Sequence, residues 1–197
     1  PIQESILTVF AEMCDLSPSQ VEIGIDGCSA PNFAVPLRNA AYAFARLCDP
    51  RGLSLERTAA CRKITSAMMA HPDMVAGPER FDTRLMEVCQ GRIIAKVGAE
   101  GYQGLGVISG ALGVDSPGIG IVFKIAEGDL GTPSAEKDDL VHRVRPAVAL
   151  EILRQMGAIK KTELEALAEF GPAKPLQNWR KLVTGESRPV FTLQKSA

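Results

Sequence analysis

A carboxylate and a thiol stand two residues apart in Asp26-Gly27-Cys28, directly after a predicted strand. The glycine between them lets the backbone turn, so that both side chains can converge on one point. Carboxylates and thiolates are both zinc ligands, although a stable site needs further donors from elsewhere. The same residues also suit an Asx-type turn with a small buried cysteine, so the spacing alone leaves both interpretations open.

A lysine followed closely by small residues occurs in the segment Ile94-Ala95-Lys96-Val97-Gly98-Ala99-Glu100-Gly101. Acyl-transfer enzymes of the penicillin-recognising class line their clefts with a lysine-x-glycine strand, where the ammonium supplies positive charge or moves a proton. Small residues beyond the lysine let backbone N–H groups approach a developing oxyanion. The alternative is an outward-facing strand lysine beside a hairpin turn, and this spacing does not decide between the two.

A charged loop over residues 71–80 holds one of the two histidines of the chain. His71 precedes a proline, which favours a helix-end residue over a catalyst. The spacing of Arg80 and Asp82 predicts a local ion pair, and Asp82 also suits the cap of a short helix. The sequence contains no GxGxxG, GxxxxGK[ST], HExxH or GxSxG motif, so no phosphate loop, zinc-protease helix or nucleophile elbow is indicated.

The elements that must position these residues follow from hydrophobic periodicity. We expect helices over residues 2–14, 36–48, 55–70, 82–88, 136–156 and 162–170. We expect strands over residues 21–25, 92–98, 102–109 and 118–126, with an edge strand at 189–193. Helices, then a block of strands, then helices again indicate an α+β fold with an antiparallel sheet flanked by helices.

Composition limits the class of protein. The 197 residues suit one domain, or a large piece of one, and 46% apolar residues can bury a core. A net charge of −1 argues against an extended nucleic-acid face and a polybasic membrane patch. No apolar run approaches the roughly 20 residues that span a bilayer. We therefore expect a soluble protein without nucleic-acid or membrane partners.

Five widely spaced cysteines without a CxxC pair argue against a disulfide framework. Four of them lie in apolar helical surroundings and are expected to be buried reduced thiols: Cys14, Cys48, Cys61 and Cys89. Reduced thiols favour a cytoplasmic protein.

Several stretches together resemble the L-asparaginase II family of bacterial amidohydrolases. They are GIDGCSAPNFAVPLRNAAYAFARL (24–47), AHPDMVAGPERFDTRLMEV (70–88), GRIIAKVGAEG (91–101) and GIGIVFKIAEGD (118–129). They occur in the order and at about the spacing of the family. The resemblance implies that residues 1–197 form a single domain, the C-terminal portion of a catalytic domain similar to serine β-lactamases and glutaminases.

The resemblance implies hydrolysis of L-asparagine to L-aspartate and ammonia through a serine–lysine acyl-enzyme, with the nucleophilic serine upstream of Pro1. Lys96 matches the lysine of the family's lysine-x-glycine strand, which includes Gly98. The Ala99 N–H is expected to help hold the oxyanion, and Asp26 and Glu100 are expected to bind the substrate.

The resemblance also implies a zinc ion held by Asp26 and Cys28 with upstream ligands, and a homodimer. Three alternatives stay open: a glutaminase, another penicillin-recognising serine hydrolase, and a non-catalytic module that binds zinc or an amino acid on the same scaffold. The lysine-x-glycine strand does not show whether asparagine or glutamine is the substrate. The two differ by one methylene group, and the depth of the substrate pocket determines which of them fits.

Overall fold

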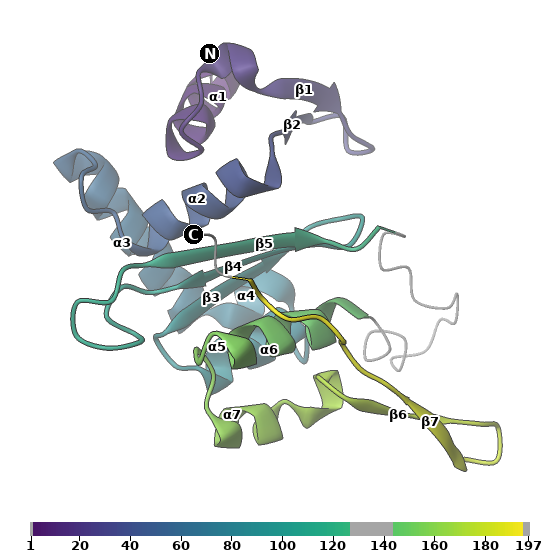
Figure 1. The fold of residues 1–197 in the computed structure, drawn as a ribbon. Coiled ribbons are helices and arrows are strands. Elements are labelled where there is room, and N and C mark those ends of the chain that lie inside the picture. The colour runs from purple at the N-terminus through teal and green to yellow at the C-terminus, as the bar shows by residue number, and fades with distance from the viewer. Residues whose placement is uncertain (1, 127–143, 195–197) are drawn as a thin grey trace. The chain divides into compact units, whose positions relative to one another are not determined.

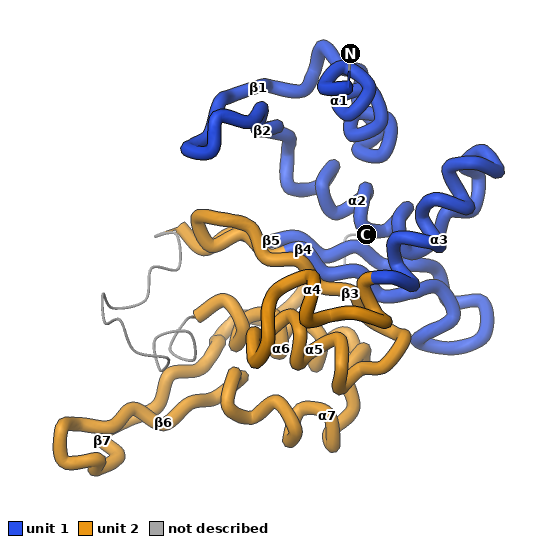
Figure 2. Tube along the Cα trace, turned by 180° about the vertical axis from the view of Figure 1, so that it is seen from behind, with its two compact units in different colours: residues 1–67, 104–123 blue, residues 68–103, 124–197 orange. Residues whose placement is uncertain are grey.

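The computed structural model describes residues 2–126 and 144–194 of the chain. The chain divides into two compact units, shown in different colours in Figure 2. Unit 1 comprises residues 1–67 and 104–123, and unit 2 comprises residues 68–103 and 124–197. Helices combine with small antiparallel sheets, so the α+β class is confirmed. The β-lactamase-like arrangement stays a prediction.

Unit 1 begins with a helix and a β-hairpin, followed by two helices (Figure 1). Its elements are α1 (Ile2–Met13), a 3₁₀ turn (Pro18–Gln20), β1 (Glu22–Ile25), β2 (Pro31–Ala34), α2 (Leu37–Cys48) and most of α3 (Leu55–Ala70). The hairpin is antiparallel, with Ile23 opposite Phe33. The Phe33 ring stacks on Phe10 of α1 with 5.0 Å between ring centroids, which fastens the hairpin to the helix.

Unit 2 carries the later helices. Its elements are α4 (Pro72–Ala76), α5 (Phe81–Val88), β3 (Ile93–Val97), α6 (Val144–Gln155), α7 (Lys161–Ala166), a 3₁₀ turn (Ala168–Phe170), β6 (Lys174–Gln177) and β7 (Val183–Ser187). Two further strands, β4 (Tyr102–Val107) and β5 (Ile119–Lys124), contribute residues to both units, and the sheet order is β3-β4-β5. The core of unit 2 is made of fully buried side chains of α5, β3 and α6: Leu85, Met86, Ile93, Ile94, Leu150 and Leu153.

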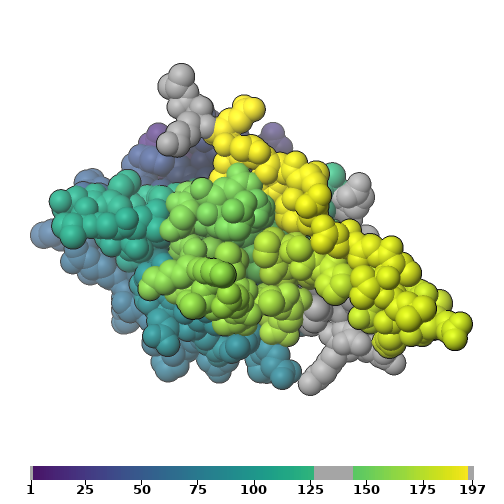
Figure 3. All heavy atoms as spheres, turned by 60° about the horizontal axis from the view of Figure 1, so that its bottom comes forward, coloured from purple at the N-terminus to yellow at the C-terminus, as the bar shows by residue number. Residues whose placement is uncertain are grey.

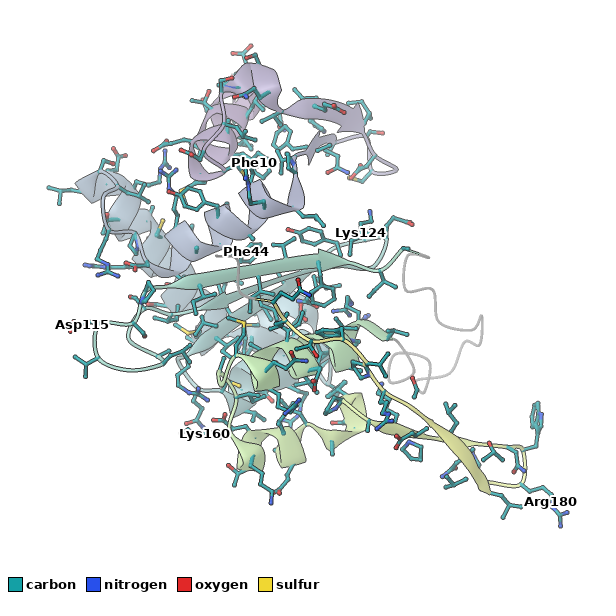
Figure 4. The ribbon with its side chains drawn as sticks, in the orientation of Figure 1. Phe10, Phe44, Asp115, Lys124, Lys160 and Arg180 are labelled. Carbon is teal, nitrogen blue, oxygen red and sulfur yellow. The ribbon has the colours of Figure 1, made fainter. Side chains whose placement is uncertain are left out.

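Glycines let α2 lie very close to the strands of unit 1. A Cβ atom on Gly120 would collide with the Ala41 carbonyl oxygen, and one on Gly104 would collide with the ring of Phe44. Phe44 lies on α2, beside the strands (Figure 4). Because the atoms concerned belong to the backbone of α2 and to the ring of Phe44, these positions accept only hydrogen.

The C-terminus of α2 is tied to the strands by a carboxylate. The Asp49 Oδ2 atom accepts a hydrogen bond from the Gly118 N–H at 3.1 Å, and both carboxylate oxygens accept from Arg51 at 2.7 and 2.5 Å. The Arg51 hydrogen bond is the largest influence and, together with the Gly118 N–H, lowers the pKa of Asp49 to about 2 against a smaller opposing effect of burial.

Three short elements differ from the expectations. No strand was expected at residues 31–34, but they pair with β1. Within the expected loop 71–80, residues 72–76 form α4, because Pro72 occupies a first helical position. The prediction of an edge strand at residues 189–193 is wrong. The Gln155 side chain donates to Phe191 O at 2.8 Å and accepts from Leu193 N at 2.8 Å, so a side chain takes the place of a neighbouring strand. The C-terminal hairpin is formed by β6 and β7 instead.

The remaining helices agree with the expectations except at their ends. The predicted helix over residues 162–170 is split into α7 and a 3₁₀ turn. Residues 136–143 of the predicted helix 136–156 lie outside the described residues, and α6 forms from Val144. The four cysteines expected to be buried are buried and free, as predicted. No helix among the described residues is both long and apolar enough to span a membrane.

The β6–β7 hairpin projects beyond α6 and α7 (Figure 3). Its turn is organised by Asn178, whose Oδ1 accepts hydrogen bonds from the Arg180 and Leu182 N–H groups at 2.9 and 3.1 Å. Arg180 points outward at the tip (Figure 4). Trp179, beside it, has a relative exposure of 102%, so its indole contacts almost nothing in this chain.

A methyl group at Gly120 should be more harmful than one at an open glycine. We expect Gly120→Ala to lower the free energy of unfolding by at least the roughly 1–3 kcal/mol typical of overpacking, because a backbone carbonyl occupies the space. Gly24→Ala is the control, since a Cβ there meets nothing within 4 Å. Denaturant unfolding measures both variants, and equal stabilities would contradict the close approach of α2.

The Asp49 carboxylate should stabilise the fold in a pH-dependent way. Because the folded-state pKa lies below the unfolded value of 3.8, its contribution is fully present above the unfolded pKa and is lost as the pH falls toward about 2. Asp49→Asn should therefore be less stable than the parent at about pH 7, with a smaller difference at about pH 3. Asp73→Asn, at an exposed carboxylate, is the control; a pH-independent difference for Asp49→Asn would refute this reasoning.

Candidate functional site

The first group of predicted site residues lies in the loop between β1 and β2. The Cys28 N–H donates to Asp26 Oδ1 at 2.9 Å, and the Cys28 thiol donates to the same oxygen at 2.8 Å. The loop is closed by hydrogen bonds from Asp26 N to Ala30 O at 3.3 Å and from Ser29 N to Asp26 O at 3.0 Å. The two side chains therefore converge, as the spacing predicted.

Both interpretations of this loop find some support. The backbone bond to Asp26 is an Asx turn, but Cys28 is exposed and not the buried cysteine expected with it. The thiol hydrogen bond, followed by the Cys28 N–H bond, lowers the pKa of Asp26. The carboxylate thus stays ionised and accepts the thiol proton, a pair that an incoming cation could displace.

Asp26 and Cys28 do not form a zinc site by themselves. They supply two donors, whereas structural zinc takes four ligands and catalytic zinc three plus water. Among residues 2–126 and 144–194, no group of three or more histidine, cysteine or acidic side chains could hold a metal. A tetrahedral zinc would also need the sulfur and oxygen about 3.6 Å apart from its bond lengths, wider than their 2.8 Å hydrogen bond.

The second group lies at the end of β3. The first three residues of the strand are buried, and Lys96 is the first exposed side chain. Its Nζ donates to Val97 O at 2.8 Å. The Tyr102 ring lies against Gly98, the second residue after Lys96. A Cβ atom added to Gly98 would stand 2.9 Å from Tyr102 Cδ1, so this position favours glycine. Lys96 is therefore a solvent-accessible ammonium on a strand whose preceding residues are fixed in the core.

The turn after this strand is tight and strained. Tyr102 N donates to Ala99 O at 3.3 Å, and Gly98 N donates to Tyr102 O at 3.0 Å. Glu100 and Gly101 between them have φ values of 56° and 68°, the pattern of a type I′ turn, in which glutamate is disfavoured. A non-glycine residue kept in the left-handed region is a recognised feature of functional sites.

The N–H of Ala99 is available to a ligand. Ala99 is exposed, and its N–H donates to no acceptor in the part of the chain that the structure describes. A free backbone donor within three residues of an accessible lysine suits the stabilisation of a developing oxyanion. The predicted residues of this second group are thus contiguous on one hairpin.

The sequence reasoning missed a buried polar cluster beneath this hairpin. Asp82, in the first turn of α5, is 2% exposed, and its Oδ2 accepts from Val97 N at 2.6 Å. Its ion partner is Arg145 of α6, at 3.7 Å between Oδ1 and Nη1, and not the expected Arg80. Arg145 also donates to Gln103 of β4. Asp82 does not cap α5, because Arg80 occupies the N-cap position.

Burial dominates the electrostatics of this cluster. Desolvation raises the pKa of Asp82, and it outweighs the opposing effects of Arg145, the Val97 N–H, Gln103 and Lys96. The sequence did contain a signal for the burial: Asp82 lies three and four residues before Leu85 and Met86, so it shares the apolar face of α5. That signal does not identify the groups that face the carboxyl.

The two groups of site residues belong to different units. Asp26 and Cys28 lie in unit 1, whereas Lys96, Gly98, Ala99 and Glu100 lie in unit 2. An SxxK pattern was not expected in this chain, but the sequence does contain one, Ser134-Ala135-Glu136-Lys137, in which the serine has the spacing of a nucleophile before its lysine. These four residues lie outside the described part of the chain.

Comparison with known proteins bears on the resemblance. The family model for L-asparaginase II matches residues 1–189. The match contains the Asp26–Cys28 loop, the Lys96 strand with its turn, and the Asp82 cluster. No curated protein matches the chain. Because the matching region is nearly the whole sequence, the chain belongs to the L-asparaginase II family.

Proposed function

We propose that the chain is part of an amidohydrolase that converts L-asparagine to L-aspartate and ammonia. Family membership indicates the hydrolysis of asparagine. The observation that carries the proposal is the hairpin of β3, which presents the Lys96 ammonium and, three residues later, the exposed Ala99 N–H. An ammonium and a backbone donor are the groups that acyl transfer needs beside a nucleophile.

The proposed reaction runs through an ester. A serine hydroxyl adds to the side-chain amide carbon of asparagine, and its proton passes through lysine to the departing nitrogen. Ammonia leaves as the C–N bond breaks, and a seryl ester remains. Water then adds to the ester carbon and releases L-aspartate, and its proton returns to the serine. In this scheme the Ala99 N–H faces the oxyanion in both steps, and Lys96 supplies positive charge or carries the proton.

The nucleophile is proposed to lie outside these 197 residues. No described serine is hydrogen bonded to a lysine side chain, in keeping with this assignment. Zinc enters the proposal only as an ion that Asp26 and Cys28 would bind together with other donors. No step of the reaction depends on it. The homodimer and the cytoplasmic location rest on the resemblance and stay predictions.

The test of the function is ammonia release from L-asparagine and from L-glutamine. Two forms are compared, the 197-residue chain and the longest reading frame that contains it. Release from asparagine by the long form alone supports the proposal. Faster release from glutamine would mean that glutamine and not asparagine is the substrate. No ammonia release by either form would favour an amino-acid-binding module. If the short chain is active, Ser134→Ala tests whether it carries the nucleophile.

Lys96→Ala should lower kcat at least about 10²-fold in the active form, the low end for a group that moves a proton. Lys161→Ala is the control, because that lysine is 91% exposed at the start of α7 and lies on another element. Its kcat should equal that of the parent. Near-normal turnover by Lys96→Ala would remove this lysine from the mechanism.

Glu100 is proposed to bind the substrate, because its carboxylate can pair with the ammonium of an amino acid. Glu100→Asn should raise the KM for asparagine at least about 10-fold, since a hydrogen bond to a charged group is lost. It should also stabilise the turn by up to about 1 kcal/mol, because asparagine tolerates a positive φ.

Asp115→Asn is the matched control, at an exposed acidic residue with a φ of 68° in another turn. Because aspartate already tolerates a positive φ, this variant should change stability little, and it should leave KM unchanged. A Glu100 variant with the KM of the parent would show that this residue serves the turn alone.

A further inference from the structure

Asp82 is a buried carboxyl group for which the proposed reaction has no use. It is 2% exposed, it does not cap its own helix, and burial raises its pKa. Replacing a whole buried ion pair with apolar side chains is often neutral or stabilising, so stability alone is a weak reason for the pair of Asp82 and Arg145. The contacts of Asp82 with the hairpin suggest another reason.

The carboxylate holds the peptide that follows Lys96. Asp82 Oδ2 accepts the Val97 N–H at 2.6 Å, and this nitrogen belongs to the peptide group whose carbonyl carbon is that of Lys96. The Val97 carbonyl oxygen in turn accepts the Lys96 ammonium at 2.8 Å. Val97 is therefore held by Asp82 on its N–H side and by Lys96 on its carbonyl side.

The carboxylate is itself held from the other elements of unit 2. Arg145 of α6 lies 3.7 Å from its Oδ1, and Gln103 of β4 contacts both Asp82 and Arg145. The Lys96 ammonium is near enough to attract the carboxylate. Within residues 2–126 and 144–194, the charged groups that face Asp82 are Arg145 and Lys96, and the polar groups are Gln103 and the Val97 N–H.

We propose that Asp82 is a positioning residue, which fixes the Val97 peptide and through it the place of the Lys96 ammonium. A displacement of about 1 Å at a reacting group can cost about 10²-fold in rate, so a fixed peptide matters more to turnover than to folding. This inference rests on the proposed role of Lys96. Asp82 itself touches no substrate in this account.

The test compares two substitutions in the form of the protein that releases ammonia. Asp82→Leu removes the acceptor for the Val97 N–H, whereas Asp82→Asn keeps an oxygen acceptor and removes the charge. We expect kcat to fall at least about 10-fold for the leucine variant with KM nearly unchanged, and to stay within about 3-fold of the parent for the asparagine variant. Equal losses in both, or no loss in the leucine variant, would overturn the positioning role.

A matched control separates positioning from general damage to α5. Thr83→Val removes the hydrogen bonds from Thr83 to Pro72 O and Gly77 O in the same turn of the helix, and neither of these bonds involves β3. Its kcat should stay near that of the parent even where its melting temperature falls. A loss of kcat equal to that of Asp82→Leu at equal stability would reduce Asp82 to a structural residue.

A double-mutant cycle distinguishes failure of this inference from failure of the proposed function. In the Lys96→Ala background, Asp82→Leu should lower kcat no further, because its effect acts through the lysine. Additive losses would overturn the positioning role and leave the role of Lys96 intact. A normal kcat for Lys96→Ala would remove the lysine from the mechanism and overturn this inference with it, whereas the absence of ammonia release by any form would overturn the proposed function.

If Asp82→Leu does not fold, Asp82→Glu takes its place. It keeps the charge beside Arg145 but lengthens the side chain by one methylene group, so the acceptor moves relative to Val97. A kcat at least about 10-fold lower with KM kept supports the role, and an unchanged kcat overturns it.

Discussion

Four elements of unit 2 meet at the buried carboxylate of Asp82. It is carried by α5 and accepts the Val97 N–H of β3, while β4 and α6 contribute Gln103 and Arg145. An ionised carboxylate in such a place is costly unless its partners are present, and removal of one partner from a buried pair typically costs about 3–5 kcal/mol. Each of the four elements is therefore held in place because it carries Asp82 or a group that stabilises the Asp82 carboxylate. Asp82 thereby connects the core to the exposed hairpin.

The two groups of family residues are built on different physical terms. Lys96 extends from a strand whose preceding residues are buried, so its backbone has little freedom. Asp26 and Cys28 lie on an exposed loop and are held mainly by each other. A rigid strand suits a side chain that must meet a reacting atom. An adaptable loop suits a metal site whose remaining ligands come from elsewhere.

Sequence reasoning succeeded where a signal is long or local. The helix expected at 55–70 is α3, and the contact of Asp26 with Cys28 follows from two residues of separation. It failed for β2 and α4, each of which begins at a proline, because a proline in these stretches was interpreted as the sign of a turn or an irregular loop. The partners of Asp82 could not be predicted either, since Val97 and Arg145 reach it only through the tertiary fold.

The projecting β6–β7 hairpin affects how this protein can be observed. Trp179 is the only tryptophan in the sequence, and it stands at the tip with its indole in water. The emission maximum of Trp179 in the folded chain should already lie at the wavelength typical of an unfolded chain. A melting curve followed by the tryptophan emission maximum would therefore be nearly flat while the core unfolds. The same property makes the indole a local reporter: a blue shift would signal that something apolar has covered the hairpin tip.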